Sequence, residues 1–309
     1  MIALVTGSSG FCGRHLVRAL ETRGATVVRL SQRIEADGVL RVDLTDVGAV
    51  AAVLEKARPD VVFHLHGASS ARDQPAFLQI NTVSAAAVLD AVERVGIEPA
   101  MLFVGSAAEY GAIESADLPV TEDHPLSPLT AYGTAKRAQT ELALLAAQRG
   151  RRVVVARPSN VIGPGMPENF ALASFARQLA EIEARRRPTL IEVGNLETFR
   201  DFIDVDDAVQ DFLALAAEPS AVGRVFNVAS GRAVRLKDAL DGLIAAFGIS
   251  VELRTDPSRL RAADVPVFYA SRERLDRTVG SRALIPLSAS LERIVADARA
   301  RLGSSSQSA

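Results

Sequence analysis

Near its N-terminus the chain reads Ile2-Ala3-Leu4-Val5-Thr6-Gly7-Ser8-Ser9-Gly10-Phe11-Cys12-Gly13, and this stretch decides the fold. The apolar run Ile2–Val5 predicts a strand buried on both faces, and glycines in the spacing G-x-x-G-x-x-G follow it. Such glycines allow a tight turn, a close approach of the backbone to a pyrophosphate, and close packing of the next helix on the strand. We therefore expect the loop to hold the pyrophosphate of a dinucleotide at a helix N-terminus.

Outward from this loop, short apolar runs alternate with longer amphipathic stretches, as in a parallel sheet covered by helices. The expected strands are Ile2–Val5, Thr26–Leu30, Val39–Val42, Val61–Leu65, Met101–Val104 and Arg152–Ala156, and a later strand, Arg224–Val228, is expected to rejoin the sheet. The expected helices are Gly13–Thr22, Val47–Lys56, Asn81–Val95 and Thr134–Gln148. The fold class is therefore α/β, a Rossmann doubly wound parallel sheet with a smaller C-terminal substrate-binding lobe.

The alternation weakens after Pro158, where prolines and glycines cluster, so we expect the chain to divide there. Residues 1–157, joined by segments returning from about 200–230, should form the NADP-binding domain. Residues 158–302 should form most of the substrate-binding lobe. The serine-rich residues 303–309 have the composition of a disordered tail.

Composition excludes several classes of protein. The net charge of −2 and the pI near 6.1 do not suggest a nucleic-acid-binding protein, which needs a basic excess. No apolar run approaches the ~18 residues of a membrane-spanning helix, and no basic region of a secretory signal precedes the first strand. The single cysteine, Cys12, permits no intrachain disulfide, which favours a cytoplasmic location. No metal site is expected, because no metal-ligand spacing is found among His15, His64, His66 and His124.

The end of the second expected strand, Leu30-Ser31-Gln32-Arg33, bears on the choice of cofactor. It lacks the acidic residue that holds the ribose hydroxyls in NAD-specific enzymes. Ser31 and Arg33 can instead bind a 2′-phosphate, which favours NADP(H) over NAD(H). The alternative is that Arg33 is a solvated loop residue. Asp43, after the third strand, is placed to meet the adenine.

The pattern Y-x-x-x-K at Tyr132 and Lys136 places both side chains on one face of a helix. A phenol normally ionises near pH ~10, and a neighbouring ammonium together with an oxidised nicotinamide favours the phenolate. Tyr132 can then pass a proton while the nicotinamide passes a hydride. Ser106 follows the fifth strand, at the edge where such sheets bind ligands, and its hydroxyl can hold the reacting carbonyl oxygen. Ser106, Tyr132 and Lys136 are the candidate catalytic residues.

Further motifs accompany this set, namely Val62-Phe63-His64-Leu65, Asn81, Tyr110-Gly111 and Arg157-Pro158. Together with the glycine loop, they resemble the extended short-chain dehydrogenase/reductases that modify nucleotide sugars, over the chain to about Leu302. The second half resembles the GDP-mannose 4,6-dehydratase and GDP-4-keto-6-deoxymannose reductase pair within that family. The motifs that carry this second resemblance are Asn160-Val161-Ile162-Gly163-Pro164-Gly165, Asn169-Phe170, Gly194-Asn195-Leu196-Glu197-Thr198-Phe199-Arg200-Asp201-Phe202 and Arg261-Ala262-Ala263-Asp264-Val265-Pro266.

The resemblance implies the members of both binding sites. Cofactor-binding roles fall on Gly7, Ser9, Gly10, Phe11, Cys12, Gly13, Ser31, Arg33, Asp43, Leu44, Leu65, Gly67, Ala68, Asn81, Tyr132 and Lys136. Substrate-binding roles fall on Ser106, Ala107, Glu109, Asn160, Asn169, Arg200 and Arg261, and the two arginines would hold the diphosphate. His66 departs from the family, which usually has alanine there. The resemblance also implies a homodimer, in which Asn81–Val95 and Thr134–Gln148 form a four-helix bundle with their partners.

One position separates the two activities of the pair. The dehydratases carry a glutamate two residues before the tyrosine of Tyr-Gly, where this chain has Ala108. The adjacent Glu109 points elsewhere, because one step along an extended chain turns the side chain. We therefore expect NADPH-dependent reduction of the C4 ketone of a GDP-4-keto-6-deoxyhexose to a GDP-6-deoxyhexose of the GDP-rhamnose type.

Two other functions remain as alternatives. A nucleotide-sugar 4,6-dehydratase or C4-epimerase with tightly held NAD(P) would use the same catalytic residues. A non-catalytic NADP-binding regulator is disfavoured by the intact set of Ser106, Tyr132 and Lys136. The nucleobase and the stereochemistry of the sugar are left open by the sequence.

Overall fold

The structure is a computed structural model that describes residues 1–32, 38–260 and 265–305. Its centre is a seven-stranded sheet in the order β11-β6-β5-β4-β1-β2-β3, in which every neighbouring pair is parallel. The predicted sheet is confirmed, including the return of Arg224–Val228 to a place beside the sixth strand. Its strands are β1 (Ile2–Thr6), β2 (Thr26–Ser31), β3 (Val39–Arg41), β4 (Val61–His64), β5 (Ala100–Val104), β6 (Val153–Pro158) and β11 (Val225–Val228).

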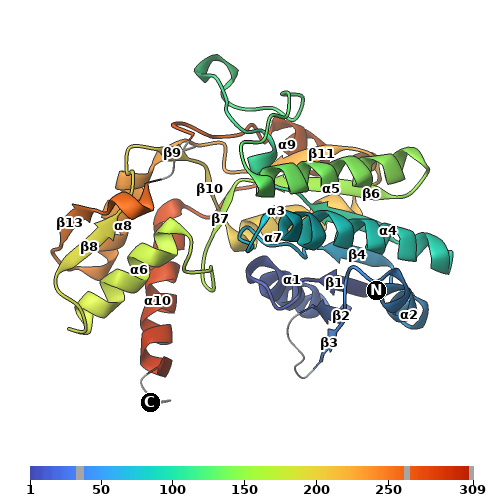
Figure 1. Ribbon diagram of the computed structural model, residues 1–309, viewed down its shortest axis with the longest axis horizontal. Helices are drawn as coiled ribbons and strands as arrows, with labels where there is room; N and C mark the ends of the chain where they lie inside the picture. Colours follow the sequence, from blue (N-terminus) through green and yellow to red (C-terminus); the bar gives the residue numbers. More distant parts are fainter. Residues whose placement is uncertain (33–37, 261–264, 306–309) are drawn as a thin grey trace.

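Helices cover both faces of the sheet, because alternate strand residues point to opposite sides. Ala3 and Phe63 enter one apolar core, whereas Leu4 and Val62 enter the other. The helices of the first core are α1 (Phe11–Thr22) and α7 (Val205–Ala217), and those of the second are α2 (Val47–Ala57), α4 (Ser84–Val95) and α5 (Ala131–Gln148). Figure 1 shows these layers in the right-hand part of the molecule.

A smaller lobe with its own apolar core lies beside the sheet, on the left in Figure 1. Its helices α6, α8 and α10 pack on one another, and its strands β8 and β13 form a parallel pair. The bounds are α6 (Ala171–Glu183), β8 (Leu190–Val193), α8 (Leu236–Phe247), β13 (Glu252–Thr255) and α10 (Leu287–Ser305).

The chain passes between the sheet and the lobe several times. After β6 the chain runs through β7 into the lobe, where it forms α6 and β8. It comes back through β9 and β10, of which β10 pairs with β7, then forms α7 and β11 and leaves again for α8. The connecting elements are β7 (Asn160–Ile162), β9 (Phe199–Arg200), β10 (Phe202–Asp204), β12 (Val234–Arg235) and α9 (Glu273–Val279). Single-turn 3-10 helices are η2 (Ala107–Glu109), η3 (Ser115–Asp117), η4 (Pro219–Ala221) and η5 (Pro257–Arg259).

Asp201, between β9 and β10, joins the segments that meet where the chain crosses. Its fully buried carboxylate accepts hydrogen bonds from the backbone and hydroxyl of Ser230 at 2.7 Å each, from Gly231 N at 3.1 Å and from Ala270 N at 3.2 Å. Ser159 Oγ donates a further bond at 3.2 Å. Burial raises the pKa of Asp201, and the bonds from Ser230 oppose that rise. Because all of these groups donate, the carboxylate holds three separate loops together.

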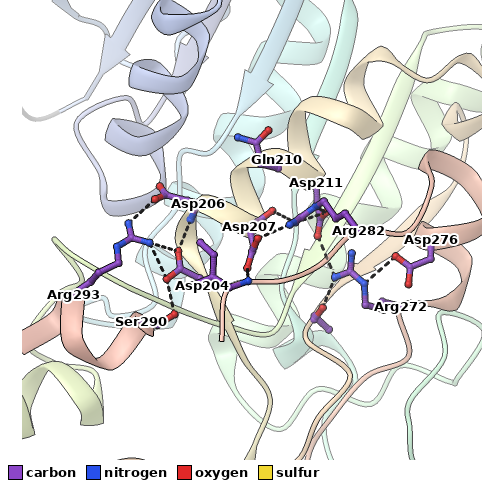
Figure 2. Close-up of polar contacts among 12 residues, drawn as sticks. Asp204, Asp206, Asp207, Gln210, Asp211, Arg272, Asp276, Arg282, Ser290 and Arg293 are labelled. Carbon is purple, nitrogen blue, oxygen red and sulfur yellow. Dashed lines mark hydrogen bonds and ion pairs between the residues drawn. The ribbon is translucent and has the colours of Figure 1, made fainter. Parts of the chain in front are cut away.

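The first turns of α7 hold the lobe to the sheet through ion pairs, which Figure 2 shows. Asp204 caps the helix and accepts bonds from Arg293 at 3.0 Å and from Ser290 at 2.6 Å, both on α10. Asp206 pairs with the same Arg293 and with His15 of α1, whose Nδ1 lies 2.8 Å from its carboxylate. A second group, around Arg282, joins Asp207 and Asp211 to the segment before α10 and to Arg272 beside α9.

The helical run Gln74–Val95 is long and apolar enough to span a membrane by length and composition alone. It consists of α3 (Gln74–Leu78), the π-helix η1 (Gln79–Val83) and α4. In the structure α3 and η1 pack on α5, and α4 packs on α2 and α5. The run therefore forms part of the layer that covers the sheet.

Several expected boundaries differ from the structure, and two of them change an element's extent or character. The helix expected to start at Asn81 belongs to a helical run that starts at Gln74, because Asp73 caps that end by accepting from Ala76 N at 2.8 Å. The tail expected to be disordered from Gly303 begins inside α10, which continues to Ser305. Residues 306–309 lie outside the described residues.

Replacing Asp201 should destabilise the protein strongly. Asp201→Ala leaves the buried N–H groups of Gly231 and Ala270 without their acceptor, so we expect the free energy of unfolding to fall by about 3–5 kcal/mol. Urea denaturation measures the change. The control is Asp123→Ala, whose exposed ion pair with Arg274 should contribute less than about 1 kcal/mol. Equal losses in the two variants would contradict the role given to Asp201.

Candidate active site

The glycine loop after β1 has the geometry that its spacing predicts. Gly7 has a φ of +67°, and a Cβ on it would lie 2.9 Å from the backbone of His66. A Cβ on Gly13 would lie 2.1 Å from Gly7 O, so only glycine lets α1 approach the strand this closely. The turn is closed by a bond from Gly10 N to Gly7 O of 2.9 Å.

The N-terminus of α1 is arranged to receive an anion. Gly10 is the N-cap residue, and no side chain caps the helix there. The first N–H groups of α1 therefore have no side-chain acceptor, and the helix dipole adds positive potential at the same place. These groups and the glycine cradle fit the pyrophosphate of a dinucleotide. Cys12 lies in this first turn, and burial raises the pKa of its thiol to about 12, which agrees with a packing role rather than that of a nucleophile.

The expected adenosine end of the site lies at the ends of β2 and β3. Ser9 Oγ and Ser31 Oγ are 3.0 Å apart, which joins the glycine loop to the end of β2. Asp43 accepts bonds from the hydroxyl of Thr45 at 2.7 Å and from its N–H at 2.9 Å, and these bonds lower the pKa of Asp43. The neighbouring Leu44 is fully buried in the core, so only its backbone can meet a ligand. Arg33 lies outside the described residues.

The loop after β4 is held in place by Asn81. The side chain of Asn81 is fully buried in the π-helix η1, accepts a bond from Ala68 N at 3.1 Å and donates one to Ala68 O at 3.1 Å. A Cβ on Gly67 would lie 2.7 Å from Asn81 Oδ1 and 3.1 Å from Lys136 Nζ, so this loop borders the candidate catalytic lysine. The structure thus gives Asn81 the task of fixing Gly67 and Ala68, which were predicted beside it as cofactor-binding residues.

The three candidate catalytic residues meet at the carboxyl edge of the sheet. Ser106 follows β5, whereas Tyr132 and Lys136 lie in the first turns of α5, which Thr130 caps by accepting from Gly133 N at 3.1 Å. Lys136 is buried, and its Nζ donates to Val104 O at 2.7 Å and to Gln139 Oε1 at 2.9 Å. Burial lowers the pKa of Lys136 to about 8.

The surroundings of Tyr132 favour its protonated phenol form. Burial raises the pKa of Tyr132 to about 12, and a hydrogen bond with Ser106 opposes the rise only in part. The expectation that Lys136 and an oxidised nicotinamide together favour the phenolate stays a prediction. The Lys136 Nζ is bound by Val104 and Gln139, and the negative charge of Glu109 contributes to the raised pKa of Tyr132.

Glu109 was predicted to bind substrate, and the structure corrects that prediction. Its side chain is fully buried, and its two carboxylate oxygens are used inside the protein. Oε1 accepts from Ser106 N at 2.7 Å, and Oε2 accepts from Arg157 Nη2 at 2.9 Å. A side chain so enclosed cannot reach a sugar, and the neighbouring Ala107 and Ala108 are the partly exposed residues of this turn.

The residues predicted to bind the sugar nucleotide lie on the segments between the sheet and the lobe. Asn160, at the start of β7, is exposed and donates to Asp201 O at 3.1 Å, and Asn169 is exposed just before α6. Arg200 ends β9 and donates to Val265 O at 2.6 Å. Arg261 lies outside the described residues. A cavity of about 660 Å³ opens nearby between α1 and the lobe, with Arg14 and Arg301 in its lining.

A comparison with known proteins decides the family. The family model described as "NAD dependent epimerase/dehydratase family" matches residues 3–229. The chain belongs to this family. The chain is also 33% identical over 306 residues to the GDP-6-deoxy-D-mannose reductase of Pseudomonas aeruginosa, with 96% of this chain and 97% of that protein covered.

Two further comparisons are with a second relative and with a solved structure. The dTDP-6-deoxy-L-talose 4-dehydrogenase (NAD(P)(+)) of Kitasatospora kifunensis is 29% identical over 82% of this chain and 81% of its own length. Among solved structures, that of RMD from Pseudomonas aeruginosa complexed with NADPH has a TM-score of 0.88 and 30% identity, covering 97% of this chain and 99% of its own. The Rossmann fold of this epimerase/dehydratase family member is thus shared with a structure that holds NADPH.

Some residues of the site had no role in the sequence analysis. Gln139 is fully buried and accepts the bond from Lys136, a contact that its place three residues further along the same helix face could have indicated. Arg157 is a charged residue directly after the apolar run of β6, which is a signal for a buried ion pair. Within the described residues, no group of three or more potential ligands could hold a metal ion.

The depressed pKa of Lys136 predicts how stability changes with pH. The pKa of Lys136 is about 8 in the folded chain against an ordinary value of 10.5, so between these pH values the unfolded chain keeps a proton that the folded chain has released. The free energy of unfolding should therefore rise with pH over this range, by about 2–3 kcal/mol relative to Lys136→Met.

Urea denaturation between pH 7 and about 10 measures this difference. Lys237→Met is the control, because Lys237 is paired with Asp241 on the outer face of α8. The free energy of unfolding of Lys237→Met, plotted against pH, should run parallel to that of the wild type. A parallel curve for Lys136→Met would show that the ammonium of Lys136 is not destabilised by burial.

Proposed function

We propose that the chain is a reductase that uses NADPH to reduce the C4 ketone of a GDP-4-keto-6-deoxyhexose, giving a GDP-6-deoxyhexose of the GDP-rhamnose type. The observation that carries the proposal is the 33% identity, over 96% of the chain, to a GDP-6-deoxy-D-mannose reductase. Ala108 supports it, because a dehydratase of the resembling pair needs a carboxylate there. The carboxylate of the adjacent Glu109 is enclosed and cannot take its place.

NADPH is the cofactor of this proposal. The solved relative from Pseudomonas aeruginosa contains NADPH, and the end of β2 offers Ser31 where NAD-specific enzymes have a carboxylate. Gly7, Gly10 and Gly13 would cradle the pyrophosphate, and Lys136 would hold the nicotinamide ribose. When bound, NADPH supplies the hydride that the C4 carbon accepts.

Tyr132 is the proton donor of the proposed reaction. Its raised pKa keeps the proton on the phenol at neutral pH, which is the form that reduction requires. As the ketone oxygen gains negative charge, the Tyr132 hydroxyl transfers its proton to that oxygen. Ser106, hydrogen-bonded to Tyr132, donates to the same oxygen and stabilises the developing charge.

The remote part of the substrate positions the sugar. Arg200 and Arg261 would hold the diphosphate by their planar guanidinium groups, and Asn160 and Asn169 would contact the sugar or the diphosphate. Binding energy from this end places the C4 ketone beside Ser106 and Tyr132. The lobe and the sheet each contribute to the proposed site, because the chain passes repeatedly between them.

A homodimer in the cytoplasm is part of the proposal. Leu78 and Val83, in the run Gln74–Val95, are 45% and 39% exposed, and Leu145 on α5 is 41% exposed. Exposed apolar side chains on adjacent helices favour a contact with a second copy of the chain. The two helical segments from each copy would form a four-helix bundle.

Sedimentation tests the dimer. The wild type should sediment as a dimer at micromolar concentration, and Leu145→Glu should shift it to monomer by placing a charge in the contact. The control Leu40→Glu changes a leucine on β3 that is somewhat more exposed and lies away from these helices, and it should stay dimeric. A wild type that is only monomeric would remove this part of the proposal.

The reaction is tested by Tyr132→Phe and by isotope transfer. Loss of the proton donor should lower turnover of the ketosugar with NADPH by about 10²–10⁴-fold while the affinity for NADPH is kept. NADPH carrying deuterium at C4 of the nicotinamide should place the label at C4 of the sugar, one equivalent for each NADPH consumed. Turnover of a GDP-hexose without added reductant and without label in the product would favour the dehydratase or C4-epimerase instead.

A further inference from the structure

We propose that Glu109 is a positioning residue of the reductase: its buried carboxylate fixes Ser106 at the end of β5 and places one negative charge behind Tyr132 and Lys136. The inference rests on the proposed function and adds to it a residue that does not touch substrate. It follows from the contacts of the carboxylate, from the space left for it and from its ionised state.

The contacts of Glu109 set the backbone of the catalytic serine. Glu109 Oε1 accepts from Ser106 N at 2.7 Å, while Ser106 Oγ accepts from Ala108 N at 3.2 Å. This reciprocal pattern is a capping box on the single turn η2. Because that turn begins where β5 ends, the carboxylate determines how far Ser106 extends beyond the sheet.

Gly105 leaves the space that the carboxylate occupies. A Cβ at position 105 would lie 2.4 Å from Glu109 Oε1 and 3.2 Å from Thr140 Oγ1. Any larger residue there would displace Glu109 from Ser106 or push against α5. The φ of Gly105 lies outside the left-handed region, so the backbone conformation does not require glycine here. The close approach of the Glu109 side chain does.

Burial raises the pKa of Glu109, but the groups that bind its carboxylate are donors, which oppose that rise and favour the ionised form. Arg157 donates to Oε2 from Nε at 3.1 Å and from Nη2 at 2.9 Å, and Ser106 N donates to Oε1. The Arg157 guanidinium also lies 4.6 Å from the centre of the Tyr110 ring, whose hydroxyl donates to Asn227 at 2.7 Å. The charge of Glu109 is thus held by a chain of buried groups that reaches β11.

The position of this charge suits a reductase. Burial alone lowers the pKa of Lys136, and the negative charge of Glu109 opposes that effect and keeps the ammonium. The same charge adds to the effect of burial in raising the pKa of Tyr132, so the phenol keeps its proton until a ketone oxygen accepts it. One carboxylate therefore favours the protonated form of both catalytic groups.

Two substitutions separate geometry from charge. Glu109→Gln keeps an oxygen for Ser106 N but removes the charge, so the alkaline limb of the kcat profile should move about one pH unit lower. Glu109→Asp keeps the charge but is one methylene shorter and draws away from Ser106. Glu109→Asp should lower kcat about tenfold, while the pH of the alkaline limb stays unchanged and KM changes by no more than about twofold.

Glu109→Gln leaves Arg157 buried without its partner, which can prevent folding. The double variant Glu109→Gln/Arg157→Met removes both charges and should show the same shift of the alkaline limb. Glu273→Gln, an exposed glutamate on α9, is the control and should match the wild type. The role proposed for Glu109 would be overturned if the alkaline limb of Glu109→Gln and of the double variant stayed at the wild-type pH. It would also be overturned if the limb of Glu109→Asp moved as far as that of Glu109→Gln.

A second measurement needs no substrate. The ultraviolet absorbance of the Tyr132 phenolate, taken as the difference between a protein and its Tyr132→Phe counterpart, should appear about one pH unit lower in Glu109→Gln than in the wild type. An unchanged value would overturn the inference. A wild type that does not reduce the ketosugar while this shift is present would count against the proposed function alone.

Discussion

The close contact between α1 and the turn after β1 is the constraint on which the rest of the site depends. With a Cβ on Gly13 placed 2.1 Å from Gly7 O, no other residue would let the helix begin at this point. The contact aims the uncapped N-terminus of α1 along the carboxyl edge of the sheet. The loops after β2, β4 and β5 are arranged around that end, so the position of Ser106 and Tyr132 relative to a bound dinucleotide follows from it.

Buried charges occur beside the candidate catalytic residues and where the chain crosses between sheet and lobe. Lys136, Glu109 and Asp201 are each nearly or completely buried, and each is bound by several partners from different elements. A buried charge with well-placed partners contributes little net stability, but it tolerates few alternative arrangements. The structure uses such groups beside the catalytic residues and at the crossing between sheet and lobe.

Much of the sheet could be predicted from the sequence because its strands are buried on both faces and read as unbroken apolar runs. That Ser106, Tyr132 and Lys136 lie at one edge of the sheet could be predicted, because strand ends and helix spacing are local properties. The enclosure of Glu109 could not, because it depends on Arg157, 48 residues away, and on the empty space at Gly105. The five donors around Asp201 were equally hidden, since they come from loops that meet only in the folded chain. The bonds of Lys136 to Val104 and Gln139 could not be predicted either, because the Y-x-x-x-K spacing does not reveal the partners of the lysine.

The helix α7 packs on the sheet, whereas the acidic side chains at its start pair with a residue of the lobe. Asp204 and Asp206 share Arg293 of α10 (Figure 2). Asp206 also pairs with His15 of α1, the helix whose N-terminus would hold the cofactor phosphates. The lobe is therefore joined to α1 through Asp206, which lies far along the chain from Ser106 and the turn η2. Any movement of the lobe that preserves these ion pairs would leave the part of α10 around Ser290 and Arg293 fixed to the start of α7.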